Sequence, residues 1–361
     1  MLKQLEETPR LPTDGVPAPT DGVLTPDKWG ARPDFSGAAA VILRVSPDQW
    51  GARPTTLTAG GSRAYGSGMN KEGPPVGRTM KAAHSASRTV PNTEIVKAGE
   101  LVEARFAKGV APSAAARKVL ALLIQKAAGD AWKPGLHSIR KRDLRGSHNG
   151  NDRLDAILNE LGGMQLRIAT VAPDGRAASM TVPVVACRIE HVADDDKSMI
   201  WWEFSEHARR AMQGSDYYAA INRGALLAFD SRYAVTMYER GCLLFGRRDP
   251  RWRGTVDELR EVMGVPTGNY RDWADIRRKV VEPACAEVNQ IADFVASYRV
   301  EHGPRNKVVA VELLFLPKPE SALADAARER EASRVGRRAR RKGNVETIAT
   351  LSLPPPQLQG A

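Results

Sequence analysis

The chain has 361 residues, of which 42% are apolar, and it carries a formal net charge of +11 with an isoelectric point near 9.7. This length predicts two or three domains, and the charge favours a polyanionic partner, with nucleic acid ahead of an anionic membrane surface. The sequence lacks the run of about 18 apolar residues that a membrane span requires. Three cysteines without paired spacing argue against a disulfide framework and a zinc site, and they favour a cytoplasmic protein.

Residues 1–95 form an arm rich in proline, glycine, threonine and alanine, with no persistent amphipathic period. Segments of this composition bury too little apolar surface to fold, so we predict that the arm is disordered. It contains one internal repeat, Pro-Asp-Lys-Trp-Gly-Ala-Arg-Pro at 26–33 and Pro-Asp-Gln-Trp-Gly-Ala-Arg-Pro at 47–54. Two interpretations stay open: a duplicated stretch of linker, or a pair of tryptophan-anchored docking motifs for a host protein.

The first folded domain is predicted over residues 113–215, from apolar periodicity and turn residues. Its predicted elements are a helix at 117–126, a short basic helix at 137–145, a turn at 146–149, a helix at 149–161, two strands at 164–171 and 180–189 joined by a turn at 172–175, a strand at 200–204, and a connecting helix capped by Ser205. The order is therefore helix, helix-turn-helix and hairpin.

The second folded domain is predicted over 220–317 and has clearer signals. Ser231 caps a helix that Gly241 ends, and Thr255 with Glu258 forms a capping box for the next helix. A break at 264–268 precedes a long helix over 269–290, in which Pro283 predicts a kink. Its inward stripe consists of Trp273, Ile276, Val280, Ala284, Val288 and Ile291. Strands at 294–300 and 307–315 follow as a hairpin.

The matching order of elements is typical of a winged helix in both domains. We therefore predict an α+β fold of two tandem winged-helix domains, with a disordered N-terminal arm and a basic C-terminal tail. The tail, 318–361, contains a run of arginines from Arg334 to Arg341 without an acidic residue. We predict that this tail is mostly disordered. Its cations are either simply solvated or, on a DNA-binding protein, add phosphate contacts.

The long helix over 269–290 carries arginines on the face opposite its apolar stripe. Arg271 and Arg278 lie two turns apart there and suit guanine edges or phosphates. The alternative is a solvated helix face with intrahelical ion pairs, since Asp275 is four residues from both Arg271 and Lys279. The predicted DNA-contact set is Asn269, Tyr270, Arg271, Arg277, Arg278 and Lys279 on the helix, Arg305 and Lys307 on the wing, and Arg140, Lys141, Arg142, Arg145 and Arg153 in the first domain.

The second domain resembles the iteron-binding plasmid replication initiators with paired winged helices. The resemblance is carried by Ser231-Arg-Tyr-Ala, the stretch from Trp252 to Arg260, Tyr270-Arg-Asp-Trp-Ala-Asp-Ile-Arg-Arg-Lys279 and the strand 308–315, and it is looser in the first domain. It implies a monomer that binds direct repeats at an origin and helps to open it. It also implies a dimer, formed through the first domain, that binds an inverted repeat and represses its own gene, and recruitment of a host initiator and helicase.

Enzyme classes are disfavoured. A rolling-circle nuclease needs two histidines flanking one apolar residue, which the six histidines do not provide, and an ATPase needs a phosphate loop, which is absent. A triplet of aspartates at 194–196 is better explained as a solvated loop than as a cation site. We therefore expect neither catalysis nor a cofactor or metal. The remaining alternative is a winged-helix transcriptional regulator without a role in replication, followed by an architectural or partition protein.

Overall fold

The structure is a computed structural model, and it describes residues 76–106, 112–145, 152–192, 197–270 and 272–344. The predicted disorder of residues 1–75 and the tryptophan repeat lie outside these residues. The folded part begins earlier than predicted, with helix α1 (Arg78–Arg88) and strand β1 (Glu94–Ala98). β1 pairs antiparallel with β8 (Tyr218–Asn222), and Ile95 is fully buried. The boundaries at 95 and 113 are therefore wrong, because the strand partner lies more than a hundred residues away in the sequence.

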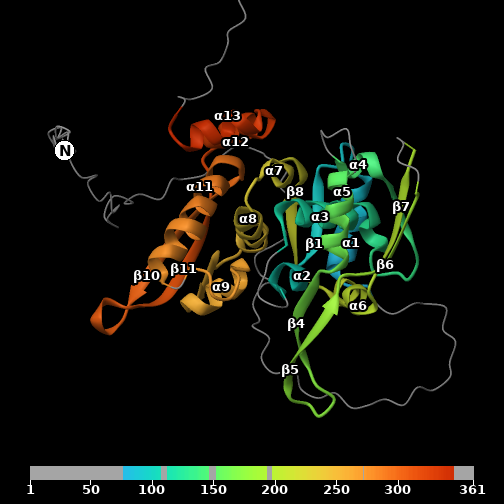
Figure 1. Ribbon diagram of the computed structural model, residues 1–361, viewed down its shortest axis with the longest axis horizontal. Helices are drawn as coiled ribbons and strands as arrows, with labels where there is room; N and C mark the ends of the chain where they lie inside the picture. Colours follow the sequence, from blue (N-terminus) through green and yellow to red (C-terminus); the bar gives the residue numbers. More distant parts are fainter. Residues whose placement is uncertain (1–75, 107–111, 146–151, 193–196, 271, 345–361) are drawn as a thin grey trace, which may run out of the picture. The chain divides into compact units, whose positions relative to one another are not determined.

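The first winged helix follows the predicted order of helices and hairpin (Figure 1) and adds a strand, β3, that was not predicted. Its elements are α3 (Ala114–Ala127), β3 (His137–Arg140), α4 (Lys141–Arg145), α5 (Asp152–Gly162), β4 (Gln165–Val171) and β5 (Ala177–Pro183). Residues 137–140, predicted as helix, are a strand because buried Ile139 lies opposite Ile200 on β7 (Met199–Phe204).

Further elements surround this unit. They are α2 (Gly99–Glu103), β2 (Arg105–Phe106), a 3-10 turn at Ala128–Asp130, β6 (Val185–Glu190) and α6 (Glu206–Gly214). The strands form two three-stranded sheets, β2-β4-β5 and β3-β7-β6. The predicted strand 180–189 is thus two strands, which pair in different sheets. Ser205 caps α6 as predicted, accepting a hydrogen bond from the backbone of Ala208.

The second winged helix repeats the same order. Its elements are α8 (Arg232–Leu244), β9 (Arg251–Gly254), α9 (Val256–Met263), α10 (Trp273–Ile276), a π turn (Arg277–Val281), α11 (Glu282–Ile291), β10 (Phe294–His302), a 3-10 turn (Pro304–Asn306) and β11 (Val308–Pro317), with α7 (Arg223–Ala228) leading into it. The antiparallel sheet has the order β10-β11-β9. The fold is therefore α+β with two tandem winged helices, as predicted.

The long helix of the second winged helix starts later than predicted and contains the expected irregularity. Asp272 is its N-cap, accepting from the backbone of Asp275 at 2.8 Å, because Tyr270 has a positive φ of 52° that no helix tolerates. Helix geometry then continues to Ile291 through the π turn, where the N–H of Glu282 donates to Arg277. Pro283 has no N–H to donate, so the widened turn accommodates it.

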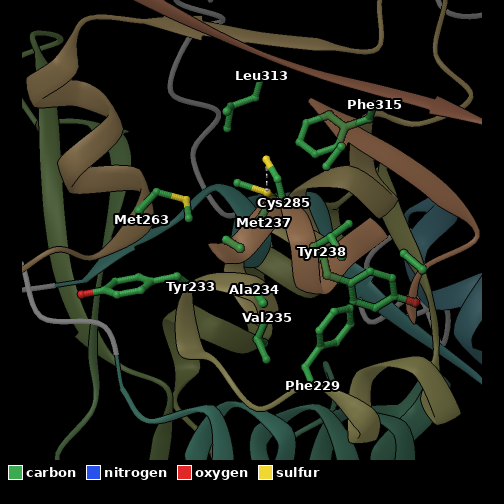
Figure 2. Close-up of a cluster of buried hydrophobic side chains, with 14 of the residues drawn as sticks. Phe229, Tyr233, Ala234, Val235, Met237, Tyr238, Met263, Cys285, Leu313 and Phe315 are labelled. Carbon is green, nitrogen blue, oxygen red and sulfur yellow. Dashed lines mark hydrogen bonds between the residues drawn. The ribbon is translucent and has the colours of Figure 1, made fainter. Parts of the chain in front are cut away.

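The core of the second winged helix lies between α8, α9, α11 and the hairpin (Figure 2). Tyr238 stacks on Phe294 at 5.8 Å between ring centroids, and Phe315 meets Phe294 edge-on. Gly241, predicted to end its helix, lies inside α8, which runs to Leu244. A Cβ there would stand 2.3 Å from the Phe294 ring, so glycine is required by close packing rather than by a helix stop.

A buried ion cluster connects the two winged helices. Glu239 of α8 is fully buried and pairs with Lys97 of β1 at 3.0 Å and with Arg117 of α3. Burial alone would raise the pKa of Glu239, but the charges of Arg117 and Lys97 outweigh it and lower this pKa. Arg117 also donates to the Thr236 hydroxyl at 2.7 Å. Lys97 and Arg117 thus share one buried carboxylate across this junction.

The tail is folded in large part, contrary to the prediction for 318–361. Helices α12 (Glu320–Glu331) and α13 (Arg334–Arg341) lie beside α11 (Figure 1). Gln290 of α11 donates to the Arg337 carbonyl at 3.1 Å, and Arg330 donates to the Ile291 carbonyl at 2.8 Å. Arginines that bind the protein's own carbonyls therefore order this segment, which a charge run in the sequence does not reveal. Residues 345–361 lie outside the described part.

Candidate nucleic-acid interface

The turn before the long helix is fixed by α9. Its capping box is present, because the Thr255 hydroxyl accepts from Glu258 N–H and the Glu258 carboxylate accepts from Thr255 N–H. Gly264 ends α9 in the left-handed conformation, with φ 65°. Arg260 of α9 donates to the carbonyls of Asn269, at 2.6 Å, and Tyr270. The guanidinium thus sets the entry of the chain into the helix, a positioning role that the sequence analysis did not identify.

Three consecutive cations project from the π turn. The side chains of Arg277, Arg278 and Lys279 are 51%, 71% and 44% exposed. Behind them, Ile276 and Val280 are fully buried. The predicted division of this helix into a buried apolar stripe and an outward cationic face therefore agrees with the described residues. Arg271 lies outside them.

Each of these cations also has a carboxylate within reach. Asp275 pairs with Arg278 at 2.9 Å and with Lys279 at 3.1 Å, and Arg277 lies 3.5 Å from Glu282. The hydrogen bonds from Lys279 and Arg278 lower the pKa of Asp275. Because these groups are exposed, such pairs are weak and exchange readily for contacts with phosphate. The intrahelical pairs considered as an alternative are real, and they do not bury the cations.

The wing stands next to this helix. Trp273 meets Tyr298 of β10 edge-on, with ring centroids 5.9 Å apart, and the Tyr298 hydroxyl donates to Glu282 at 2.9 Å. At the tip, Arg305 and Lys307 are exposed, and Arg305 adopts a positive φ of 58°. The hairpin thus packs against the helix that carries the cations and ends in two basic residues.

On the sheet of the wing, basic residues alternate with acidic ones across the strands. Arg299 lies opposite Glu312, which lies opposite Arg253 on β9. Arg253 also pairs with Glu301. Strand β9 brings Arg253 to the wing, and its four residues, Arg-Trp-Arg-Gly, gave too short a pattern to be predicted as a strand.

In the first winged helix, the predicted DNA-contact residues are not all exposed. Lys141 is 4% exposed and lies 3.3 Å from Glu190 and 3.8 Å from Asp155. Its amine is therefore committed to the protein, and we remove it from the contact set. Arg140 and Arg142 are exposed. Arg145 and Arg153 also line a cavity, and their contact with DNA stays a prediction.

A metal site and a membrane-spanning helix are both absent from the residues that the structure describes. Among them, no three histidine, cysteine, aspartate or glutamate side chains are grouped so that they could hold a metal ion. The aspartates at 194–196 lie outside that part of the chain. Within it, no helix is both long and apolar enough to cross a membrane.

Comparison with known proteins identifies the second winged helix. Residues 255–315 match the family model of the initiator Rep protein, WH2. These residues are similar to the WH2 domain of initiator Rep proteins. The match begins at the capping box of α9 and ends on β11, so it contains the cationic helix and the wing. The resemblance to replication initiators is confirmed over these residues.

Among the solved structures that are similar to the chain, one covers more than half of it. It is described as the crystal structure of Pi initiator protein in complex with iteron DNA, with 15% sequence identity and a TM-score of 0.46. The similarity covers 63% of this chain and 98% of the other. No curated protein matches the chain at a significant level.

Proposed function

We propose that the protein is a plasmid replication initiator, which binds iteron repeats in double-stranded DNA at a replication origin and helps to open it. The observation that carries the proposal is the exposed cationic face of residues 277–279 on a domain of the initiator Rep family. In a winged helix this helix enters the major groove, while the wing contacts the backbone. The proposed activity is binding, and it requires no catalytic residue.

Within this function the cations have separate roles. Asn269, Tyr270, Arg271 and Arg278 are proposed to lie at the groove, and Arg277, Lys279, Arg305 and Lys307 to contact phosphates. In the first winged helix, Arg140 and Arg142 are proposed to add backbone contacts. Binding to phosphates releases counterions, so affinity is expected to fall steeply with salt.

We further propose that the protein recruits a host initiator and helicase, and that a dimer formed through the first winged helix binds an inverted repeat and represses its own gene. The edge strand β6 supports the proposed dimer. Among the described residues it pairs with β7 alone, and Ile189 at its end is 53% exposed. An open strand edge with an exposed apolar side chain is suited to pairing with a second copy. These activities belong to the bacterial cytoplasm, where the plasmid replicates.

Footprinting of the full chain on its upstream plasmid region tests the proposal. Protection of direct repeats, spaced by a whole number of helical turns, is the expected result. Protection of one palindrome alone would instead favour a transcriptional regulator, and protection without sequence preference an architectural protein. Protection of both a direct-repeat array and an inverted repeat would agree with the monomer and dimer modes.

A matched pair of arginine variants locates the interface. Arg278 and Arg210 have side chains that are 71% and 70% exposed, and both pair with a carboxylate on their own helix. We expect Arg278→Ala to weaken specific binding by about 1–3 kcal/mol and to reduce the salt slope by about one. Arg210→Ala on α6 should leave both unchanged. Equal affinities for the two variants would remove the helix over 273–291 from the interface.

A further inference from the structure

Helix α13 packs on the segment that connects the two winged helices. Buried Arg337 donates to the Ala228 carbonyl at 3.0 Å and to the carbonyl of Ala332. Arg334 and Arg338 both pair with the Asp230 carboxylate, at 2.5 and 2.9 Å. The C-terminal helix is thus held on residues 228–230 by a set of charged hydrogen bonds.

The same segment is held from its other side by the first winged helix. Lys118 of α3 donates from Nζ to the Leu227 carbonyl at 2.8 Å and to the Phe229 carbonyl. Burial lowers the pKa of this amine to about 8, which leaves it charged at neutral pH. Helices α3 and α13 therefore both bind residues 227–230, one from each side, and these contacts hold open the space between them.

A cavity of about 480 Å³ occupies this space, between α3, the end of α4, the first half of α5, residues 227–230 and α13. One part of its wall is apolar and comes from Val119, Leu122, Leu144, Leu154, Ile157 and Leu227. The other part is cationic and comes from Lys118, Arg145, Arg153, Arg334 and Arg337. Asp230 is the one carboxylate among these lining residues, and two arginines already neutralise it.

We propose that this cavity is a docking site for an acidic peptide segment of a partner protein, with one large apolar side chain entering the cavity and carboxylates on its arginine rim. The volume suits one or two apolar side chains, and buried apolar anchors ringed by polar contacts are how peptides bind most tightly. The excess of cations selects an acidic segment. DNA phosphates would satisfy the cations and leave the apolar wall uncovered, so a peptide fits better than a nucleic acid.

The proposal deepens the recruitment of host proteins and rests on the proposed function for the identity of the partner. It requires nothing of the helix over 273–291. Binding of peptide and binding of DNA are therefore expected to be lost in different variants, which makes the two proposals separable.

The test uses the full chain and a fluorescein-labelled peptide of twelve residues that alternates aspartate with leucine around a central tryptophan. Two control peptides replace all aspartates by lysine, or all apolar residues by serine. We expect the acidic, apolar peptide to bind at least about tenfold more tightly than either control, because both charge and apolar burial contribute. Equal binding of the serine peptide would overturn the proposal, since it would show that charge alone is recognised.

Variants of the cavity wall complete the test. Arg153→Glu at the exposed rim and Ile157→Asp in the apolar wall should each weaken the peptide about tenfold or more. Val335→Asp, at an exposed position of α13 that does not line the cavity, should not. Arg278→Ala should bind the peptide normally and DNA more weakly, whereas Ile157→Asp should bind DNA normally and the peptide more weakly. Unchanged peptide affinity in both wall variants, or displacement of the peptide by an unrelated duplex, would overturn the docking site.

Discussion

The two winged helices share one order of elements and use their cations in opposite ways. In the first winged helix and strand β1 beside it, Lys97, Arg117 and Lys141 are buried and pair with carboxylates. In the second, Arg277 and Arg278 are exposed and pair with acids on their own helix. The comparison teaches that the number of basic residues in a domain does not identify its DNA-binding face. What matters is whether the anionic partner of each cation is the protein itself.

The largest expected effect comes from removing the anion that holds the buried cations. Glu239→Ala leaves Lys97 and Arg117 without their shared carboxylate in a buried junction, and we expect a loss of about 3–5 kcal/mol in the free energy of unfolding. Denaturant unfolding followed by circular dichroism measures it. The exposed Glu206→Ala, which removes the partner of Arg210, is the control and should change stability by less than about 0.5 kcal/mol.

The pH dependence of the same pair of proteins provides a second readout. Because the pKa of Glu239 is lowered below its ordinary value of 4.5, its contribution to stability is present above that value and is lost as the pH falls through the lowered pKa. The difference in stability between the parent protein and Glu239→Ala should therefore shrink in acid. A loss at neutral pH no larger than that of Glu206→Ala would show that the cations of the first winged helix are not committed to the junction.

A smaller effect is expected where cations of the tail hold the connection between the winged helices. Arg337→Ala removes hydrogen bonds to the carbonyls of Ala228 and Ala332. We expect the free energy of unfolding to fall by about 2 kcal/mol. The fall is limited because the substitution also removes the Nε, which has no acceptor among the described residues. Hydrogen exchange of the amides in 227–231 and α13 should accelerate. The exposed Lys342→Ala should leave it unchanged. Equal exchange rates in the two variants would show that Arg337 does not hold α13 on the connecting segment.

The sequence predicted best what local residues determine. The capping box of Thr255, the glycine break after α9 and the apolar stripe from Trp273 to Ile291 all depend on neighbours within one or two helical turns. The cationic face opposite that stripe follows from the same periodicity. The fold of the second winged helix and the outward position of Arg278 were therefore predictable.

What the sequence did not predict depends on distant partners. Strands β1 and β3 are short and are defined by pairing with β8 and β7, far along the chain. Lys141 belongs to a run of basic residues, and its burial depends on Glu190 on another sheet strand. The order of α13 likewise depends on carbonyls and a carboxylate at 228–230. In each case the deciding contact lies outside any sequence window.

The smallest expected effect concerns the exposed cations of the second winged helix. Asp275 accepts from Arg278 and Lys279, so its charge competes with DNA phosphates for them. We expect Asp275→Asn to tighten DNA binding about two- to fivefold, in line with the weak energies of exposed pairs, as measured by fluorescence anisotropy at fixed salt. Asp325→Asn is the matched control, since Asp325 pairs with Arg328 three residues later on α12, as Asp275 does with Arg278. Weaker binding by Asp275→Asn would reverse the interpretation: the carboxylate would then hold the two cations in the orientation that DNA requires, and the second winged helix would depend on an internal anion as much as the first does.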